Sequence, residues 1–170
     1  DSSLSIIGNY SFYQTKIIQI YIPMYVSLIG SYAFYGCSSL GEVKFDPKSR
    51  LTILAPYAFY QTSITYIKIP LSVYFIYDYV FCRCASLITV EFTDGSRINK
   101  IGNYVFAESG LQSIVLPASL STINDYVFYN CYALNTVTFF GAINADGSAC
   151  EDAYCATLSS IGDYVFYGTK

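Results

Sequence analysis

Apolar and polar residues alternate along this chain in a pattern that returns seven times. Each return closes on a phrase such as IGNYVF, in which an apolar residue precedes a tyrosine and a phenylalanine. The seven closing phenylalanines are Phe12, Phe34, Phe59, Phe81, Phe106, Phe128 and Phe166. We number the coils one to seven, each by the phenylalanine that it contains. They are separated by 22, 25, 22, 25, 22 and 38 residues. Self-similarity at this period predicts a solenoid, in which each repeat forms one coil stacked on the previous one.

A second pattern, of the form L-x-x-I-x-I, follows each of the first six phenylalanines after a short turn. Its last two apolar residues lie two apart, as in a strand with one buried face. The six sets are Ile17/Ile20/Ile22, Leu40/Val43/Phe45, Ile64/Ile67/Ile69, Leu87/Val90/Phe92, Leu111/Ile114/Leu116 and Leu134/Val137/Phe139. Stacked in parallel, they predict a six-rung sheet with rungs roughly 4.8 Å apart. Pro23, Pro70 and Pro117 end every odd-numbered strand, where a missing N–H does least damage to a ladder.

The chain returns to the next phrase through a second apolar position in each coil. These positions are Ile7, Ile29, Leu54, Ile76, Ile101, Ile123 and Ile161. A glycine follows in four coils, at Gly8, Gly30, Gly102 and Gly162. We expect a bend with unusual backbone angles there, and then a short helical or 3-10 turn around the phenylalanine. The predicted fold class is therefore a solenoid of about six to seven coils, mainly of parallel β-strands with short helical or 3-10 turns.

Coil lengths alternate, so the repeating unit is a pair of coils with 22 + 25 = 47 residues, called here the double coil. The second and fourth coils carry the longer return loops FDPKSRLTI and FTDGSRINK. Such loops predict a ridge on every second coil along one edge. In the sixth coil, residues 141–157 form a polar, turn-rich insertion that predicts a projecting loop. We expect residues 1–170 to form one solenoid domain, interrupted by this loop at about 141–158.

Tyrosine is abundant, with 19 copies, and it recurs at two fixed places in the coil. The first column holds Tyr10, Tyr32, Tyr57, Tyr79, Tyr104, Tyr126 and Tyr164. The second holds Tyr13, Tyr35, Tyr60, Tyr129 and Tyr167, and is interrupted by Cys82 and Ala107. Rings stacked at rung spacing each add on the order of 0.5–1.5 kcal/mol beyond area burial. Both columns are interpreted either as structural, with the rings covering the coil edge, or as an adhesive face.

Composition narrows the classes of partner. Charged residues make up only 12% of the chain, the net charge is −3, and no basic run occurs along the sequence. These features give no electrostatic reason to expect nucleic acid or an anionic membrane as partner. No run of 18 apolar residues occurs, so we expect no membrane insertion in this segment. Because the chain begins at Asp1, we expect a mature or excised piece that has lost any targeting segment.

The six cysteines do not predict a general disulfide framework. Cys37, Cys84 and Cys131 recur two rungs apart, about 9.6 Å, beyond the roughly 7 Å that a disulfide allows between Cα atoms. We interpret them as small buried side chains. Cys150 and Cys155 bracket EDAY in the insertion and are the candidate disulfide, which indicates an oxidising compartment. Cys82 has no obvious partner.

No catalytic constellation is visible, and we predict neither an enzyme nor a cofactor. Histidine is absent, and no phosphate loop, nucleophile elbow or zinc-type cysteine spacing occurs. Asp146, Glu151 and Asp152 in the insertion are better interpreted as a solvated turn than as a weak calcium site. Asn9-Tyr10-Ser11 matches a glycosylation sequon by chance, because Ser11 stands where other coils place inward residues.

The outward residues of the predicted strands are the candidate binding face, as in other solenoids. These twelve residues are Gln19, Tyr21, Glu42, Lys44, Tyr66, Lys68, Thr89, Glu91, Ser113, Val115, Thr136 and Thr138. They are small, polar and mixed in sign, which favours a broad, shallow protein or glycan contact over a pocket. Lys68 and Glu91 stand at equivalent places on neighbouring strands and could form an ion pair.

The repeat, and above all Ile29-Gly30…Ala33-Phe34…Cys37-Ser38-Ser39-Leu40, resembles the BspA-like (Treponema pallidum-type) leucine-rich repeat. The resemblance covers the whole chain except the insertion. The tyrosine-rich motif Tyr32-Ala33-Phe34-Tyr35 looks most like that of the family members found in protists. It implies an extracellular or cell-surface protein of the kind linked to adhesion to host matrix and cells. It implies no enzyme and transfers no ligand-contacting residue.

Two functions remain open at this point. The first is a binding module that adheres to host or matrix proteins through the outward face or the tyrosine columns. The second is a structural subunit that assembles head to tail into an extracellular filament or coat, since neither end carries the atypical capping repeat that solenoids need. The uncapped ends are equally expected of a fragment of a longer surface protein.

Overall fold

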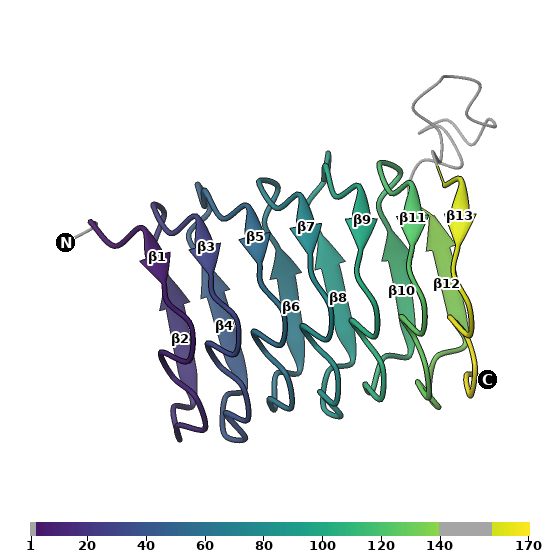
Figure 1. Cartoon of the computed structure of the whole chain (residues 1–170), viewed down its shortest axis with the longest axis horizontal. Helices are drawn as coiled ribbons and strands as arrows, with labels where there is room; N and C mark the ends of the chain where they lie inside the picture. Colours follow the sequence, from purple (N-terminus) through teal and green to yellow (C-terminus); the bar gives the residue numbers. More distant parts are fainter. Residues whose placement is uncertain (1–2, 140–157) are drawn as a thin grey trace.

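The computed structural model describes residues 3–139 and 158–170, which stack as seven coils along one axis (Figure 1). The short strands are β1 (Ile6–Ile7), β3 (Leu28–Ile29), β5 (Ile53–Leu54), β7 (Phe75–Ile76), β9 (Lys100–Ile101), β11 (Thr122–Ile123) and β13 (Ser160–Ile161). The long strands are β2 (Gln19–Ile22), β4 (Glu42–Phe45), β6 (Tyr66–Ile69), β8 (Thr89–Phe92), β10 (Ser113–Leu116) and β12 (Thr136–Phe139). All paired neighbours run parallel. The predicted parallel solenoid is confirmed.

The long strands coincide with the L-x-x-I-x-I segments, but the prediction of one continuous six-rung sheet is wrong. Hydrogen bonding divides them into β2-β4-β6-β8 and β10-β12. Inside a double coil, four residue pairs join the two long strands. Between double coils, β4 and β6 share only the pair Glu42–Tyr66, and β8 has no such pair with β10. The longer loops at residues 46–50 and 93–97 leave the even coils at these junctions, and they part the strands there.

The short strands form an unbroken seven-stranded sheet, in the order β1-β3-β5-β7-β9-β11-β13. A third backbone ladder runs through the phrase itself. In each of the first six coils three N–H groups donate to carbonyls of the next coil, as Tyr32, Phe34 and Gly36 do to Pro56, Ala58 and Tyr60. Both of these hydrogen-bond ladders continue across every junction between coils. Among the described strands, backbone pairing is therefore interrupted only on the side of the long strands.

The expected helical turn around the phenylalanine is absent from the described residues, which show consecutive tight turns instead. The cause is a positive φ at two places in every coil. One is the tyrosine of the first column, as at Tyr32 with φ 59°, and the other is the residue four positions later, as at Gly36 with φ 66°. A left-handed residue interrupts a helix, and here it allows the N–H groups of the phrase to reach the next coil.

The glycines after the return strands have a different role from the one expected. Among the described glycines, positive φ occurs at Gly36, Gly95 and Gly168 and at none of the four predicted positions. A Cβ on Gly30 would lie 2.7 Å from the backbone nitrogen of Asn9, and one on Gly102 would lie 2.8 Å from that of Asp78. At Gly30 and Gly102 glycine is therefore favoured because adjacent coils approach closely, whereas a Cβ on Gly8 would meet nothing closer than 3.5 Å.

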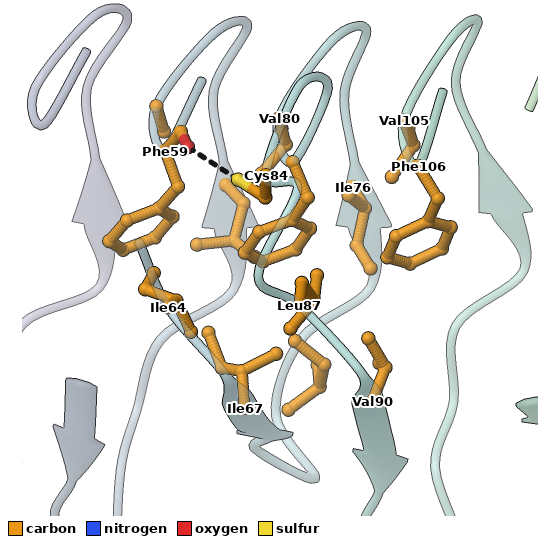
Figure 2. Packing of buried hydrophobic residues seen from close by; sticks show 14 of the residues in the cluster. Phe59, Ile64, Ile67, Ile76, Val80, Cys84, Leu87, Val90, Val105 and Phe106 are labelled. Atoms are coloured by element: carbon orange, nitrogen blue, oxygen red, sulfur yellow. Dashed lines mark hydrogen bonds between the residues drawn. The ribbon is translucent and has the colours of Figure 1, made fainter. Parts of the chain in front are cut away.

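A spine of phenylalanine rings fills the centre of the stack. The rings from Phe12 to Phe166 lie 5.0–5.7 Å apart between centroids, with planes within 10° of parallel. Phe34, Phe59, Phe81, Phe106 and Phe128 are fully buried in one hydrophobic cluster. Figure 2 shows part of this cluster, with Ile64, Ile67, Leu87 and Val90 packed below the rings. The core is continuous along the axis, as a stack of coils in register requires.

Beside the spine, thiols and hydroxyls alternate from coil to coil. Cys37, Cys84 and Cys131 are buried and unbridged, as predicted. The Cys84 thiol donates to the carbonyl of Phe59 at 3.1 Å (Figure 2) and lies 3.2 Å from the hydroxyl of Thr62, which holds the equivalent position in the preceding coil. Because the thiol proton is engaged, the hydroxyl donates to the sulfur. The same pairs recur in the other double coils, at Thr15 and Cys37 and at Ser109 and Cys131.

Candidate binding clefts

The outward face of the long strands is exposed, as the alternation predicted. Of the twelve candidate residues only Glu91 is half-buried. The ion pair of Lys68 with Glu91 is present, and the Tyr66 hydroxyl donates to the same carboxylate. Lys44 pairs with Glu42 at 2.7 Å on its own strand. These contacts fix several long side chains on the face.

Two clefts open on this face, one at each junction between double coils. The first cleft lies over β4 and β6, between the ridge loops at residues 46–50 and 93–97, and has a volume of about 1090 Å³. The second cleft lies between β8 and β10, beside residues 93–96, and has a volume of about 450 Å³. The predicted ridges are therefore present, and they form walls of both clefts.

A serine closes each ridge loop onto the following coil. The Ser72 hydroxyl lies 2.9 Å from the carbonyl of Ser49 and 2.7 Å from that of Leu51. At the equivalent place, the Ser119 hydroxyl lies 2.8 Å from the carbonyls of both Ser96 and Ile98. The two clefts therefore share one backbone construction.

Cations gather in the first cleft. Five of the nine lysines and arginines of the chain line it, namely Lys44, Lys48, Arg50, Lys68 and Arg97. The Arg50 guanidinium lies 4.7 Å from the centre of the Tyr25 ring, a cation–π contact. Sequence analysis found no basic cluster because these residues are spread over residues 44–97 and only stacking brings them together. The available signal was the dipeptide Ser-Arg, which stands at the same place in both ridge loops.

Two phenols of the first cleft are held by carboxylates. The Tyr21 hydroxyl donates to Asp46 at 2.8 Å, and this hydrogen bond raises the pKa of the phenol. The Lys48 backbone N–H, and then Tyr21, lower the pKa of Asp46. The hydrogen bond to Glu91, together with partial burial, raises the pKa of Tyr66 to about 12. Lys68 and then Tyr66 lower the pKa of Glu91. All four groups are therefore fixed in their usual charge states at neutral pH.

The second cleft differs in its chemistry. Among the described residues that line it there is no lysine or arginine, and its acidic members are Glu91 and Asp94. Phe92, Ile114 and Pro117 supply apolar surface. The cleft therefore offers a smaller, less charged cavity on the same scaffold.

The twelve candidate residues divide among these features. Tyr21, Lys44, Tyr66 and Lys68 line the first cleft, and Thr89, Glu91, Ser113 and Val115 line the second. Gln19, Glu42, Thr136 and Thr138 lie on the face outside both. Sequence analysis missed the cations of the ridge loops, because they lie outside the strand pattern. Cys150, Cys155 and the acidic residues of the insertion lie outside the described residues.

The tyrosines form the stacked columns that the sequence predicts. In the first column, the ring centroids lie 4.5–5.2 Å apart with planes within 9°. The second column stacks from Tyr13 to Tyr60 and again from Tyr129 to Tyr167. Cys82 fills the gap as a buried free thiol, and burial raises its pKa to about 12. Such a thiol is inert at neutral pH.

Residues 3–139 and 158–170 contain no group of three or more acidic or cysteine side chains arranged to hold a metal ion. In the same part of the chain, no helix has the length and apolar character needed to cross a membrane.

Stacked coils, each with one outward strand and a shared phenylalanine spine, define the protein as a parallel β-solenoid of the leucine-rich-repeat class. The sequence profile of the BspA type leucine rich repeat region matches residues 5–135 in six copies, and the chain belongs to this family. The resemblance inferred from the repeat phrase is confirmed. Solenoids of this class are in general non-catalytic scaffolds for protein interaction.

Several solved structures share the fold. The pneumococcal vaccine antigen PcpA is 25% identical with a TM-score of 0.69, over 72% of this chain and 30% of that one. A leucine rich cell surface protein from Faecalibacterium prausnitzii is 24% identical with a TM-score of 0.58, over 94% and 61%. The T. pallidum leucine rich repeat protein is 20% identical with a TM-score of 0.54, over 96% and 69%. The chain thus spans less than two thirds of the first two. No curated protein matches it.

Proposed function

We propose that this chain is an extracellular or cell-surface binding module that adheres to host or matrix proteins through the outward face of its long strands. Membership of the BspA type family supports this role. So does the likeness to PcpA, a vaccine antigen, since an antigen of that kind has to be accessible to antibodies.

The observation that carries the proposal is the fixed, exposed character of the face. Tyr21 is 55% and Tyr66 46% exposed, yet both phenols are held by carboxylates of the adjacent coil. A side chain that is already ordered loses less conformational entropy on binding. Tyrosine and arginine are also the residue types that dominate the energetics of protein interfaces. The face therefore suits a broad protein contact.

The test is adhesion of displayed protein to immobilised matrix proteins, with the variant Y21A/Y66A/K68A. Because interface residues of this kind contribute about 1–2 kcal/mol or more each, adhesion should fall at least about tenfold. The matched control is Y10A/Y13A/K16A, which removes the same residue types from the tyrosine columns and their surroundings. Unchanged adhesion in the first variant would overturn the proposal, and loss in the control alone would move the contact to the columns.

A second candidate is head-to-tail self-assembly. In the last described coil Ile161 is 51% and Phe166 40% exposed, whereas their counterparts Ile123 and Phe128 are fully buried. A second copy stacked on this coil would cover both side chains, and so would further coils of the same chain. Light scattering of the purified chain over a range of concentrations tests assembly. A stable monomer at high concentration rules it out.

A further inference from the structure

We propose that the first cleft binds an acidic polysaccharide, that is, a sugar chain carrying sulfate or carboxylate groups. The site shares Tyr21, Tyr66 and Lys68 with the protein contact proposed above, but three of its five cations, Lys48, Arg50 and Arg97, lie on the ridge loops and not on the long strands. Its ligand recognition rests on three features of the cleft: charge on both walls, exposed ring surface, and fixed carboxylates.

Charge on the walls comes from ridge-loop cations that form no side-chain ion pair with another described residue. Lys48 and Arg50 lie on one ridge loop and Arg97 on the other, and all three are exposed. None of them forms an ion pair within the described ranges, where the pairs are those of Lys44, Lys68 and Arg83. The central carbon of the Arg50 guanidinium lies over the Tyr25 ring, 4.7 Å from its centre, and the N–H donors of that group make no hydrogen bond to another described residue. They remain able to grip a sulfate or carboxylate in bidentate fashion.

The interior of the cleft offers apolar surface of the kind that sugar rings contact through their C–H faces. Tyr66 is 46%, Leu71 46% and Tyr74 43% exposed, and all three line the cleft. Aromatic side chains of this sort combine a large apolar area with a polar end. A small inorganic anion would leave this surface unused.

Fixed carboxylates distinguish a polysaccharide from an acidic peptide. Asp46 lies in the cleft lining, and Glu91 is bound to Lys68 and Tyr66 at its edge. An acidic peptide would bring its own carboxylates against both groups and has few hydroxyls to donate. An acidic sugar chain carries hydroxyls that donate to carboxylates as well as anionic groups that the cations bind. The mixed lining therefore favours the sugar.

The shape of the cleft suits a chain and not an isolated sugar. The ridge loops belong to the second and fourth coils, so they lie two rungs apart, roughly 9.6 Å at ordinary strand spacing. The cleft volume of about 1090 Å³ stands at the upper end of the roughly 300–1,000 Å³ that ligand pockets occupy. Cations on both walls can then bind successive anionic groups of one chain.

The experiment compares two triple variants that change the net charge equally. K48A/R50A/R97A removes the cations of the ridge loops, and K16A/R83A/K100A removes three cations outside the first cleft. Binding of a heparin oligosaccharide is measured by calorimetry at physiological salt, with polyglutamate and neutral dextran as comparison ligands. The three substitutions remove the charged hydrogen-bond donors that would hold the sulfate groups. The first variant should therefore bind at least about tenfold more weakly, and the control should stay within about twofold of the native chain.

Each outcome decides the proposal. It is supported if the native chain binds heparin but not dextran, prefers heparin to polyglutamate, and loses affinity only in the ridge-loop variant. Equal loss in both variants shows non-specific attraction and overturns it, as does no heparin binding at all. Equal or tighter binding of polyglutamate assigns the cleft to acidic peptides instead. Thermal unfolding of each variant excludes a folding defect. Because K48A/R50A/R97A leaves Tyr21, Tyr66 and Lys68 in place, protein adhesion of this variant is measured as well, and unchanged adhesion beside lost heparin binding shows that the two proposals can fail separately.

Discussion

The two clefts are copies of one backbone design with different side chains. They stand one double coil apart, and equivalent positions carry Lys44 and Glu91, Tyr66 and Ser113, and Lys68 and Val115. The inward neighbours are conservative by contrast, since Val43 and Val90 are both buried against the same core. The two clefts differ in volume as well as in their outward residues and loops. The first has about 1090 Å³ and the second about 450 Å³.

This difference shows that one set of residues stabilises the coil and another set lines the clefts. The spine, the thiol–hydroxyl pairs and the three backbone ladders involve inward side chains and main chain alone. Outward positions of the long strands contribute to none of the inward packing, so their chemistry can change while the coil stays intact. A solenoid built by duplication can therefore present several unlike clefts in a row.

The largest expected effect is on the scaffold that both clefts share. Phe81 is fully buried between Phe59 and Phe106, with ring centroids 5.6 Å and 5.7 Å away. Replacing it by alanine should cost about 3–5 kcal/mol of unfolding free energy, as for other buried phenylalanines. Urea unfolding measures this. The matched variant F166A, in which the ring is already 40% exposed, should lose less than half as much. Equal losses would show that the spine is not the shared support.

A smaller effect is expected from the serines that close the ridge loops. S72A and S119A each remove one hydroxyl donor from a half-buried site, which costs about 1 kcal/mol. Hydrogen exchange should quicken at the Ser49 amide in the first variant and at the Ser96 amide in the second, because both N–H groups donate inside their own ridge loop. Unequal responses would break the claim that the clefts share one construction.

Transplanting residues sharpens the comparison further. S113Y/V115K gives the second cleft the side-chain types that the first has at Tyr66 and Lys68. Both positions are exposed, so the fold should tolerate the change within about 0.5 kcal/mol. In a K48A/R50A background, the added ring and charge should tighten heparin binding about two- to tenfold. No gain by calorimetry would mean that the ridge-loop cations, and not the strand residues, determine ligand choice.

Sequence patterns predicted the fold well because each inward position repeats in every coil. The spacing of the phenylalanines gave the coil boundaries, and the pairs such as Ile67 and Ile69 gave the long strands. Burial of Cys37, Cys84 and Cys131 without disulfides followed from their separation. These features depend only on one coil and its nearest neighbours. The repeating sequence pattern therefore predicts them directly.

Features that depend on particular backbone geometry were missed. Left-handed angles fall on tyrosines such as Tyr57, φ 60°, although glycine is the residue expected to adopt them. The backbone ladder between coils stabilises this conformation in place of residue preference. The split between β8 and β10 depends on how a loop parts two strands, and the basic cleft depends on residues up to two coils apart. Neither feature can be predicted from a local sequence pattern.

The smallest expected effect concerns pH and distinguishes the clefts by their phenols. The pKa of Tyr66 is raised to about 12 by Glu91 and by partial burial, whereas the equivalent residue of the second cleft is Ser113. A raised pKa means that the neutral phenol is favoured in the folded state. Its contribution to stability is complete below the unfolded pKa of about 10 and is lost as pH rises through about 12.

Y66F should therefore be slightly less stable than the native chain at neutral pH, because it lacks the hydrogen bond to Glu91. The difference should shrink as the pH rises above about 10, where the native phenol begins to lose its advantage. Urea unfolding over the alkaline range measures the difference, and absorbance titration should show one late-ionising phenol fewer in Y66F. The control Y132F removes a phenol that is 66% exposed and has no carboxylate partner among the described residues, so it should cost no stability at neutral pH. A difference between Y66F and the native chain that stays constant with pH would mean that Glu91 does not hold the phenol, and the ordered face of the first cleft would lose its main support.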